Sequence, residues 1–170
     1  MDEIILVDVY DRVCGSAEKL AAHRQPLLHR AFSIFLYHGE QVLIQKRALA
    51  KYHSGGLWAN SCCSHPRVGE SVLTAAGRRL PEELGCRAVV EDIASFVYFH
   101  RFDDAMFEYE YDHILVGEYN GSLQPNPDEV AELKWVDQQA LAADLLLHPQ
   151  QYSVWFQIAA PMVLRWLAQK

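Results

Sequence analysis

The feature that most constrains the fold is one helical segment set between strand-like segments. Residues Ser71–Leu84 have helical character, with Ser71 as a candidate N-cap and Gly85 as a candidate stop. Pro81 conflicts with this assignment, because a proline inside a helix loses a backbone hydrogen bond and crowds the carbonyl four residues earlier. We therefore expect a kink or an early 3₁₀ turn at Pro81.

Strand-like segments lie on both sides of this helix in the sequence. Apolar runs and alternating patterns predict strands at Ile4–Val9, Ala31–Tyr37, Gln41–Lys46, Val89–Tyr98, Met106–Glu118 and Leu133–Val136. The second and third of these are joined by a short turn, which indicates a β-hairpin. Glu18–His23 predicts a loop or a helical turn, and Gln138–Leu147 and Ser153–Gln169 predict helices. This order is typical of a single α+β or mixed α/β sandwich domain over residues 1–170.

Composition excludes several classes of function. The 170 residues include 15 Lys and Arg against 22 Asp and Glu, a net charge of −7, whereas binding to a nucleic-acid backbone needs a basic face. We expect no membrane span, because no apolar run is long enough, and no secretion signal, because the first residues are not basic. The four cysteines, Cys14, Cys62, Cys63 and Cys86, resemble no disulfide framework, so the cytoplasm is the expected compartment.

A cysteine and a histidine are paired in residues 61–66. If this segment is extended, Cys63 and His65 share a face and Cys62 points away from them. A cysteine beside a histidine can be a nucleophile, an acid or base, or half of a metal site. Free cysteines are more often small core residues, and this interpretation suits Cys62. The loop setting and His65 favour a function for Cys63.

Three acidic residues alternate with aromatic residues in the segment 107–112. A period of two puts Glu108, Glu110 and Asp112 on one face of a strand, where they repel unless a cation or solvent compensates. On pattern alone, a solvent-exposed strand face is the commoner interpretation. The alternative is a metal site, because carboxylates together with histidines suit Zn²⁺, Mn²⁺ or Fe²⁺. Candidate histidines are present at His23, His29 and His65, although each alone is more often a surface or core residue.

A longer pattern, running from residue 64 to residue 86, resembles the Nudix box. Its matching positions are Glu70, Arg78, Leu80, Glu82, Glu83, Gly85 and Cys86. The resemblance implies a Nudix-like α/β/α sandwich with a mixed sheet.

The same pattern departs from the Nudix box at two positions. Ser64 stands in place of the first glycine, and Arg79 stands in place of a glutamate. In Nudix hydrolases that glutamate and the Glu-Glu pair hold catalytic Mg²⁺ near a diphosphate. An arginine there removes a metal ligand and adds a phosphate binder, so the usual hydrolysis is not expected.

Five ordered segments together resemble type I isopentenyl-diphosphate isomerase, a branch of the Nudix fold. They are Leu27–Ser33, Asn60–Pro66, Arg78–Gly85, Glu108–Glu110 and Trp155–Phe156. Several segments in the same order are harder to obtain by chance than one motif. The resemblance implies that isopentenyl diphosphate is isomerised to dimethylallyl diphosphate by protonation and deprotonation, a reaction of isoprenoid precursor synthesis.

The resemblance also implies roles for individual residues. The expected ligands of a Mn²⁺ or Zn²⁺ ion are His23, His29, His65, Glu108 and Glu110, and Glu83 is expected to help hold Mg²⁺ on the diphosphate. Basic residues facing the diphosphate are expected at Lys19, Arg47, Lys51 and Arg79. The expected catalytic residues are Cys63 and Glu110, which transfer protons, and Tyr98 and Trp155, which line the hydrocarbon pocket.

Two other functions stay open. A Nudix-type diphosphate hydrolase needs a full set of helix carboxylates, which Arg79 interrupts. A non-catalytic domain with a structural Zn²⁺ needs Cys63, His65 and a further histidine as ligands. For the isomerase, the expected partner is a small allylic or homoallylic diphosphate, and the family usually acts as a monomer.

Overall fold

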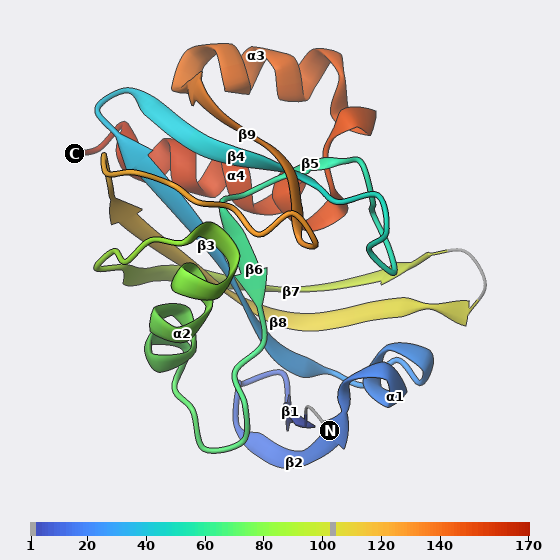
Figure 1. Ribbon diagram of the computed structural model, residues 1–170. Coiled ribbons are helices and arrows are strands. Elements are labelled where there is room, and N and C mark those ends of the chain that lie inside the picture. Colours follow the sequence, from blue (N-terminus) through green and yellow to red (C-terminus); the bar gives the residue numbers. More distant parts are fainter. Residues whose placement is uncertain (1–2, 103–104) are drawn as a thin grey trace.

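A mixed β-sheet lies between helices in the computed structural model, which describes residues 3–102 and 105–170 (Figure 1). The strands are β1 (Glu3–Val7), β2 (Val13–Glu18), β3 (His29–His38), β4 (Gln41–Arg47), β5 (Trp58–Ala59), β6 (Cys62–Ser64), β7 (Glu91–Arg101), β8 (Phe107–Glu118) and β9 (Val130–Asp137). The helices are α1 (Lys19–Arg24), α2 (Val72–Leu84), α3 (Gln138–Leu147), the 3₁₀ helix η2 (Pro149–Gln151) and α4 (Val154–Leu167). Residues 1–2 and 103–104 of the predicted single domain lie outside the described residues.

Strand β3 is the centre of the sheet. It pairs with β1, β4 and β6 antiparallel and with β8 in parallel, and β7 continues the sheet beyond β8. The predicted mixed sheet is therefore confirmed. The parallel pairing also sets His29 beside Glu110, two residues from opposite halves of the chain.

The alternation of side chains along β3 builds two separate cores. Phe32 and Ile34 belong to the core beneath α2, whereas Phe35 and Tyr37 belong to the core beneath α3 and α4. Phe35 stacks on Phe156 of α4 with ring centroids 5.7 Å apart. Burial of each such side chain stabilises the fold by about 1.5–3 kcal/mol. Helices thus cover both faces of the sheet, which confirms the α/β/α sandwich (Figure 1).

Helix α2 has the predicted caps. The Ser71 hydroxyl accepts a hydrogen bond from the Thr74 amide, and Gly85 ends the helix with a φ of 64° that favours glycine. Of the two alternatives expected at Pro81, a kink or an early 3₁₀ turn, the 3₁₀ turn is wrong, because residues 72–84 are α-helical throughout. The carbonyl that Pro81 cannot bond belongs to Gly77, which is exposed, so water can replace the lost hydrogen bond.

The other expectations differ from the structure mainly at element ends. The hairpin of Ala31–Tyr37 and Gln41–Lys46 is confirmed as β3 and β4. The polar segment Glu18–His23 forms a helical turn, because the Glu18 carboxylate caps α1 by accepting from two backbone amides. Strand β2 was not predicted, because its residues are mostly exposed and carry no apolar alternation.

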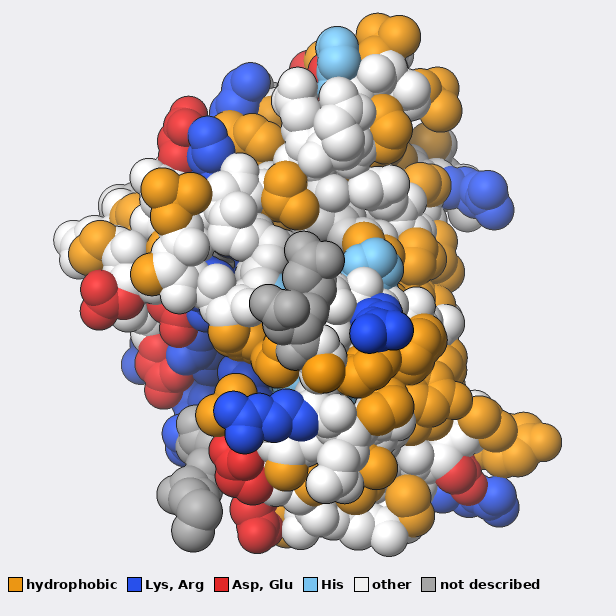
Figure 2. All heavy atoms as spheres, turned by 90° about the vertical axis from the view of Figure 1, so that its right-hand side faces the viewer, with side chains coloured by type: hydrophobic (Ala, Val, Ile, Leu, Met, Phe, Trp, Pro, Cys, Tyr) orange, Lys and Arg blue, Asp and Glu red, His pale blue; other side chains and the backbone are white. Residues whose placement is uncertain are grey.

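Strands β7 and β8 extend to one side of the sheet as a hairpin (Figure 1). Figure 2 looks onto that side and shows hydrophobic side chains gathered across part of the surface. Val97 and Phe99 of β7 are among the exposed large hydrophobic residues of the protein. Within the described residues, no helix is both long enough and apolar enough to cross a membrane.

Candidate active site

Glu110 lies at the centre of a buried polar cluster. Its strand, β8, lies between β3 and β7, and the register places His29 on one side of Glu110 and Tyr98 on the other. The His29 Nε2 atom is 3.4 Å from Glu110 Oε1, and the Tyr98 hydroxyl donates to Glu110 Oε2 at 3.0 Å. His65 follows β6 and brings its Nε2 atom to 3.0 Å from Glu110 Oε1. The sheet therefore assembles residues that are far apart in the sequence.

Four of the predicted metal ligands form a compact donor group. The donor atoms of His23, His29, His65 and Glu110 all lie within 4.8 Å of one another. The Nδ1 atoms of His23 and His29 contact the backbone oxygens of Lys19 and Leu27 at 2.6 and 2.8 Å. This leaves both Nε2 atoms as lone-pair donors, and they are buried without a hydrogen-bond partner in the described part of the chain. The group fits a divalent metal ion, because imidazoles fixed in this way are good ligands.

The charge states of these residues also suit metal binding. Burial lowers the pKa of His65 to about 3 and lowers the pKa of His23. Burial tends to lower the pKa of His29 too, but the Glu110 carboxylate outweighs it and raises that pKa. Burial opposes ionisation of Glu110, yet the neighbouring imidazoles of His29 and His65 hold its pKa well below the usual range. His23 and His65 are therefore neutral beside an ionised Glu110 carboxylate, whereas His29 is the imidazole that the carboxylate favours in its protonated form.

The acidic face of β8 is buried, so the interpretation as a solvent-exposed face is wrong. Glu108, Glu110 and Asp112 do share one face, but they are only 4%, 6% and 1% exposed. The reason is that each has partners within the protein. Glu108 accepts a hydrogen bond from the Tyr98 hydroxyl, and Asp112 accepts one from Ser33 at 2.8 Å. Burial and the neighbouring Glu110 charge raise the pKa of Asp112 well above its usual range.

Cys62 and Cys63 point to opposite faces of the sheet, as predicted. Cys62 lies in the core beneath α2, and Cys63 lines a cavity of about 190 Å³. The Cys63 thiol donates to Asn60 Oδ1 at 2.9 Å, and the Trp155 indole N–H lies 3.2 Å from the sulfur. Burial raises the pKa of Cys63, so the residue is a protonated thiol at neutral pH.

Asn60 is a site residue that sequence reasoning missed. Its Oδ1 atom accepts hydrogen bonds from both the Cys63 thiol and the Trp155 indole, the second at 3.0 Å. Its Nδ2 atom donates to the backbone oxygens of Ile34 and Cys62 at 3.1 and 2.8 Å, which fixes the orientation of the amide. Asn60 stands in a segment that carries the family resemblance, but nothing local in the sequence indicates that it joins two catalytic candidates.

The predicted basic residues line the same cavity as Cys63, Glu110 and Trp155. They are Lys19, Arg47, Lys51 and Arg79. Arg47 packs on the Trp155 ring with its guanidinium carbon 5.1 Å from the ring centre. Burial lowers the pKa of Lys19, and the charge of Lys51 adds to that effect. Positive charges held this close to one another suit a ligand with several negative charges.

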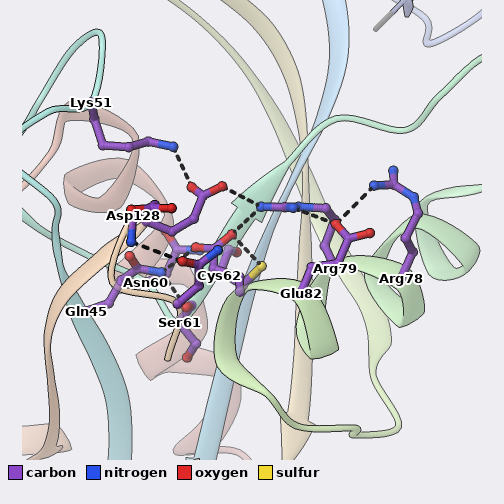
Figure 3. A network of polar contacts seen from close by, with 12 residues as sticks. Gln45, Lys51, Asn60, Ser61, Cys62, Arg78, Arg79, Glu82 and Asp128 are labelled. Atoms are coloured by element: carbon purple, nitrogen blue, oxygen red, sulfur yellow. Dashed lines mark hydrogen bonds and ion pairs between the residues drawn. The ribbon is translucent and has the colours of Figure 1, made fainter. Parts of the chain in front are cut away.

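Arg79 forms ion pairs with the carboxylates of helix α2. Its guanidinium lies 2.6 Å from Glu82, 2.9 Å from Glu83 and 3.3 Å from Glu129. Glu129 also pairs with Lys51 at 2.5 Å, which links Lys51 and Arg79 in one network (Figure 3). In Figure 3 Arg79 reaches from α2 toward Lys51, between the acidic groups.

Glu83 lies apart from the histidine cluster, beneath Arg79. It is buried, accepts a hydrogen bond from Gln45 at 2.6 Å and contacts the Cys62 sulfur. Burial raises the pKa of Glu83, against the lowering effect of Arg79. Glu83 is not among the described residues that line the cavity. Its predicted contact with Mg²⁺ therefore requires that Arg79 releases the carboxylate.

His53 is a second residue that sequence reasoning missed. It lies in the loop between β4 and β5, lines the cavity and is 7% exposed. Its Nε2 atom lies 2.6 Å from Glu108 Oε1. Glu108 thus contacts Tyr98 and His53, whereas the donor group of the described residues contains Glu110. A lone histidine in a loop gives no sequence signal of such a contact.

Comparisons with known proteins agree with this geometry. The NUDIX domain model matches residues 27–156. A curated relative from Serratia proteamaculans, "Isopentenyl-diphosphate Delta-isomerase", is 48% identical over 158 residues, covering 92% of this chain and 88% of the relative. A relative of the same name from Burkholderia multivorans is 42% identical and covers 97% of both chains.

Solved structures show the same fold. DR0079 from Deinococcus radiodurans aligns with a TM-score of 0.77 at 19% identity, covering 95% of this chain and 98% of that one. A MutT protein from Methanosarcina mazei aligns with a TM-score of 0.66 at 16% identity, covering 84% and 96%. At these identities the likeness extends to the fold alone.

Proposed function

On the premise that the chain belongs to the NUDIX domain family and, within it, to the isopentenyl-diphosphate Delta-isomerases, we propose that the cavity lined by Cys63, Glu110 and Trp155 is its active site. The protein isomerises isopentenyl diphosphate to dimethylallyl diphosphate. The double bond moves when one carbon gains a proton and another carbon loses one. The roles of individual residues in that reaction are inferred from their contacts.

The observation that carries the proposal is that two different proton carriers line one cavity. Cys63 is a thiol, because burial raises its pKa, and Glu110 is a carboxylate, because two histidines hold its pKa low. One group therefore holds a proton to give and the other a lone pair to receive one. Tyr98 donates to Glu110 and fixes the orientation of its carboxylate. An alkene is a weak base, so this fixed placement is essential.

Trp155 suits the cationic intermediate of such a reaction. Protonation of the alkene leaves a tertiary carbocation, which an aromatic face stabilises by cation–π attraction. The hydrogen bond from the Trp155 indole to Asn60 fixes the plane of that ring. Asn60 also holds the Cys63 thiol, so it sets the position of the proton carrier relative to the aromatic face.

We propose that His23, His29, His65 and Glu110 hold Mn²⁺ or Zn²⁺, with Glu108 as a further ligand. The orphaned Nε2 atoms of His23 and His29 support this proposal. The bound ion supplies positive charge beside Glu110 and tunes how readily that carboxylate exchanges a proton.

The basic residues of the cavity are proposed to bind the diphosphate. The Nε atoms of Arg47 and Arg79 are buried and have no hydrogen-bond partner in the described part of the chain, so an anion would satisfy them. Mg²⁺ is proposed to accompany the diphosphate, with Glu83 as its protein ligand. Arg79 argues against diphosphate hydrolysis, because it already neutralises Glu82 and Glu83. We propose that the chain works as a one-domain monomer on this small molecule.

Product analysis of a matched pair of cysteine variants tests these assignments. Metal-stripped protein receives Mg²⁺ with Mn²⁺ or Zn²⁺, and NMR follows the conversion of isopentenyl diphosphate. Cys63→Ala should abolish isomerisation, whereas Cys14→Ala, at an exposed cysteine, should leave it intact. Release of phosphate without isomerisation would favour the hydrolase. Metal bound in stoichiometric amount, with neither activity, would favour the structural zinc domain.

A further inference from the structure

His53 joins three elements at the wall of the cavity. Its ring stacks on Phe102, which follows β7, with centroids 4.3 Å apart and an interplanar angle of 11°. The same ring meets Trp155 of α4 edge-on at 5.6 Å and 82°. His53 thus fills the space between the β4–β5 loop, the end of β7 and the aromatic residue proposed to face the cation.

Polar contacts hold the His53 ring in this orientation. Its Nδ1 atom lies 3.1 Å from the Ser54 hydroxyl, and its Nε2 atom lies 2.6 Å from Glu108 Oε1. Arg47 donates to the His53 backbone oxygen at 3.3 Å. The Nε2 approach to Glu108 is a close contact without hydrogen-bond geometry, so the ring is held by Ser54, by its backbone and by its two aromatic neighbours, which leave it little rotational freedom.

His53 does not share the position of the metal-binding histidines. The donor group found among the described residues comprises His23, His29, His65 and Glu110, and the His53 ring lies 6.5 Å from that of His23. Its contacts are instead with the aromatic residues and with Glu108. The position of His53 therefore bears on the hydrocarbon end of the substrate.

A wall at this end has a specific chemical consequence, which rests on the proposed function. If water reaches the tertiary carbocation, an oxygen lone pair forms a C–O bond to the cationic carbon. The water then loses a proton to solvent, and the product is a tertiary alcohol diphosphate. An isomerase must exclude this water to return the cation to an alkene.

We propose that His53 is a positioning residue that closes the cavity beside Trp155 against water and holds Glu108 in place. The ring performs the first role through Phe102 and Trp155, and the Nε2 atom performs the second. The two roles can be separated by substitution. His53→Ala removes both, whereas His53→Phe keeps an aromatic wall and removes the contact with Glu108.

The test measures product partition in ¹⁸O-labelled water. With isopentenyl diphosphate as substrate, His53→Ala should lower kcat by about 10- to 100-fold, since misplacement near the reacting atoms has effects of this size. It should also divert a measurable fraction of the product to the ¹⁸O-labelled tertiary alcohol. KM should change by less than about threefold, because no diphosphate-binding side chain is removed. His53→Phe should make no alcohol but recover only part of kcat.

Further variants make every outcome decisive. His148→Ala, at an exposed histidine far along the sequence, should behave as the unchanged protein. If His53→Ala does not fold, Phe102→Ala removes the stacking partner from the other side and should give the same labelled alcohol. The proposal is wrong if kcat is unchanged, if kcat falls without labelled alcohol, or if His53→Phe makes as much alcohol as His53→Ala. Absence of isomerisation by the unchanged protein would instead refute the proposed function.

Discussion

Carboxylates border this cavity in two regions, and the protein treats them in opposite ways. On β8, Glu110 faces imidazoles that keep it ionised and leave lone pairs available for a metal ion. On α2, Glu82 and Glu83 are paired with the guanidinium of Arg79. One region is therefore arranged for cation binding, whereas the other has an internal cation.

We propose that this difference lets the fold keep a Nudix-like helix without diphosphate hydrolysis. A guanidinium among the helix carboxylates already neutralises Glu82 and Glu83, so Mg²⁺ can bind Glu83 only when Arg79 releases it. The donor group of histidines lies instead at the junction of β3, β6 and β8. The fold is retained while the cation site lies on the sheet.

The largest expected effect comes from breaking the sheet region. Glu110→Gln keeps the shape of the side chain but removes its charge and its ability to exchange a proton. We expect kcat to fall by about 10³- to 10⁴-fold, the upper part of the range of about 10²- to 10⁴-fold that a positioned acid or base contributes, because Glu110 is also a proposed metal ligand. Steady-state kinetics measure this effect. Glu118→Gln, at an exposed position of the same strand, is the control and should retain full activity.

The next largest effect comes from removing the internal cation of the helix region, so that its carboxylates are free to bind a metal ion as those of the sheet region are. Arg79→Glu restores the carboxylate of the Nudix box, removes the cation that pairs with Glu83 and leaves Glu129 with Lys51 alone. We expect the free energy of unfolding to fall by about 3 kcal/mol, as when one partner of a buried ion pair is removed. Millimolar Mg²⁺ should recover part of this loss only in the variant. Denaturant titrations with and without Mg²⁺ measure the free energy of unfolding of the variant. Arg87→Glu, at an exposed position, is the control. If Mg²⁺ does not stabilise Arg79→Glu, the comparison between the two regions is wrong.

Adding a metal ion to the unchanged protein should stabilise it through the donor group of the sheet region. Zn²⁺ at a hundredfold excess over its Kd should raise the free energy of unfolding by about 2.7 kcal/mol. His23→Ala should abolish most of this gain, because it removes one of the four donor residues. Calorimetric titration and thermal unfolding measure both effects. A gain of equal size in His23→Ala would place the ion elsewhere.

The smallest expected effect is the loss of stability at low pH that follows protonation of Glu70, which precedes α2 and pairs with Arg78 of that helix. The Arg78 guanidinium binds Glu70 and lowers its pKa to about 2, from a usual value of 4.5. The pair therefore stabilises the fold fully above pH 4.5, and this contribution is lost as the pH falls toward 2. We expect Glu70→Gln to cost about 1 kcal/mol at neutral pH, because solvent screens the pair. Denaturant unfolding at pH 7 and pH 3 measures the cost of the substitution. Glu132→Gln, at an exposed position of β9, is the control. An equal cost at both pH values would contradict the prediction.

Sequence patterns predicted the fold well where they depend on local chemistry. Ser71 and Gly85 marked the ends of α2 correctly, and the period of two placed Glu108, Glu110 and Asp112 on one face. The pattern did not reveal that this face is buried. Burial depends on partners such as Tyr98 and the histidines, which reach Glu110 only through the pairing of three strands.

The parts of the site that sequence reasoning missed are those defined by contact alone. Asn60 and His53 have ordinary residue types in irregular segments, and their roles come from neighbours distant in the sequence. The resemblance to the family named Glu83 as a metal ligand, but the structure places Arg79 between it and the cavity network. No local rule of spacing indicates which of two nearby carboxylates a guanidinium will cover.

The parallel pairing of β3 with β8 has a consequence for how the protein acquires its activity. His29 and Glu110 meet only after the chain has closed a long loop that includes α2 and β7. Contacts between residues this far apart in the sequence form slowly. A chain in which β3 and β8 have not yet paired therefore lacks the complete donor group. The rate at which the protein gains tight metal binding should then follow the rate at which its tertiary structure forms.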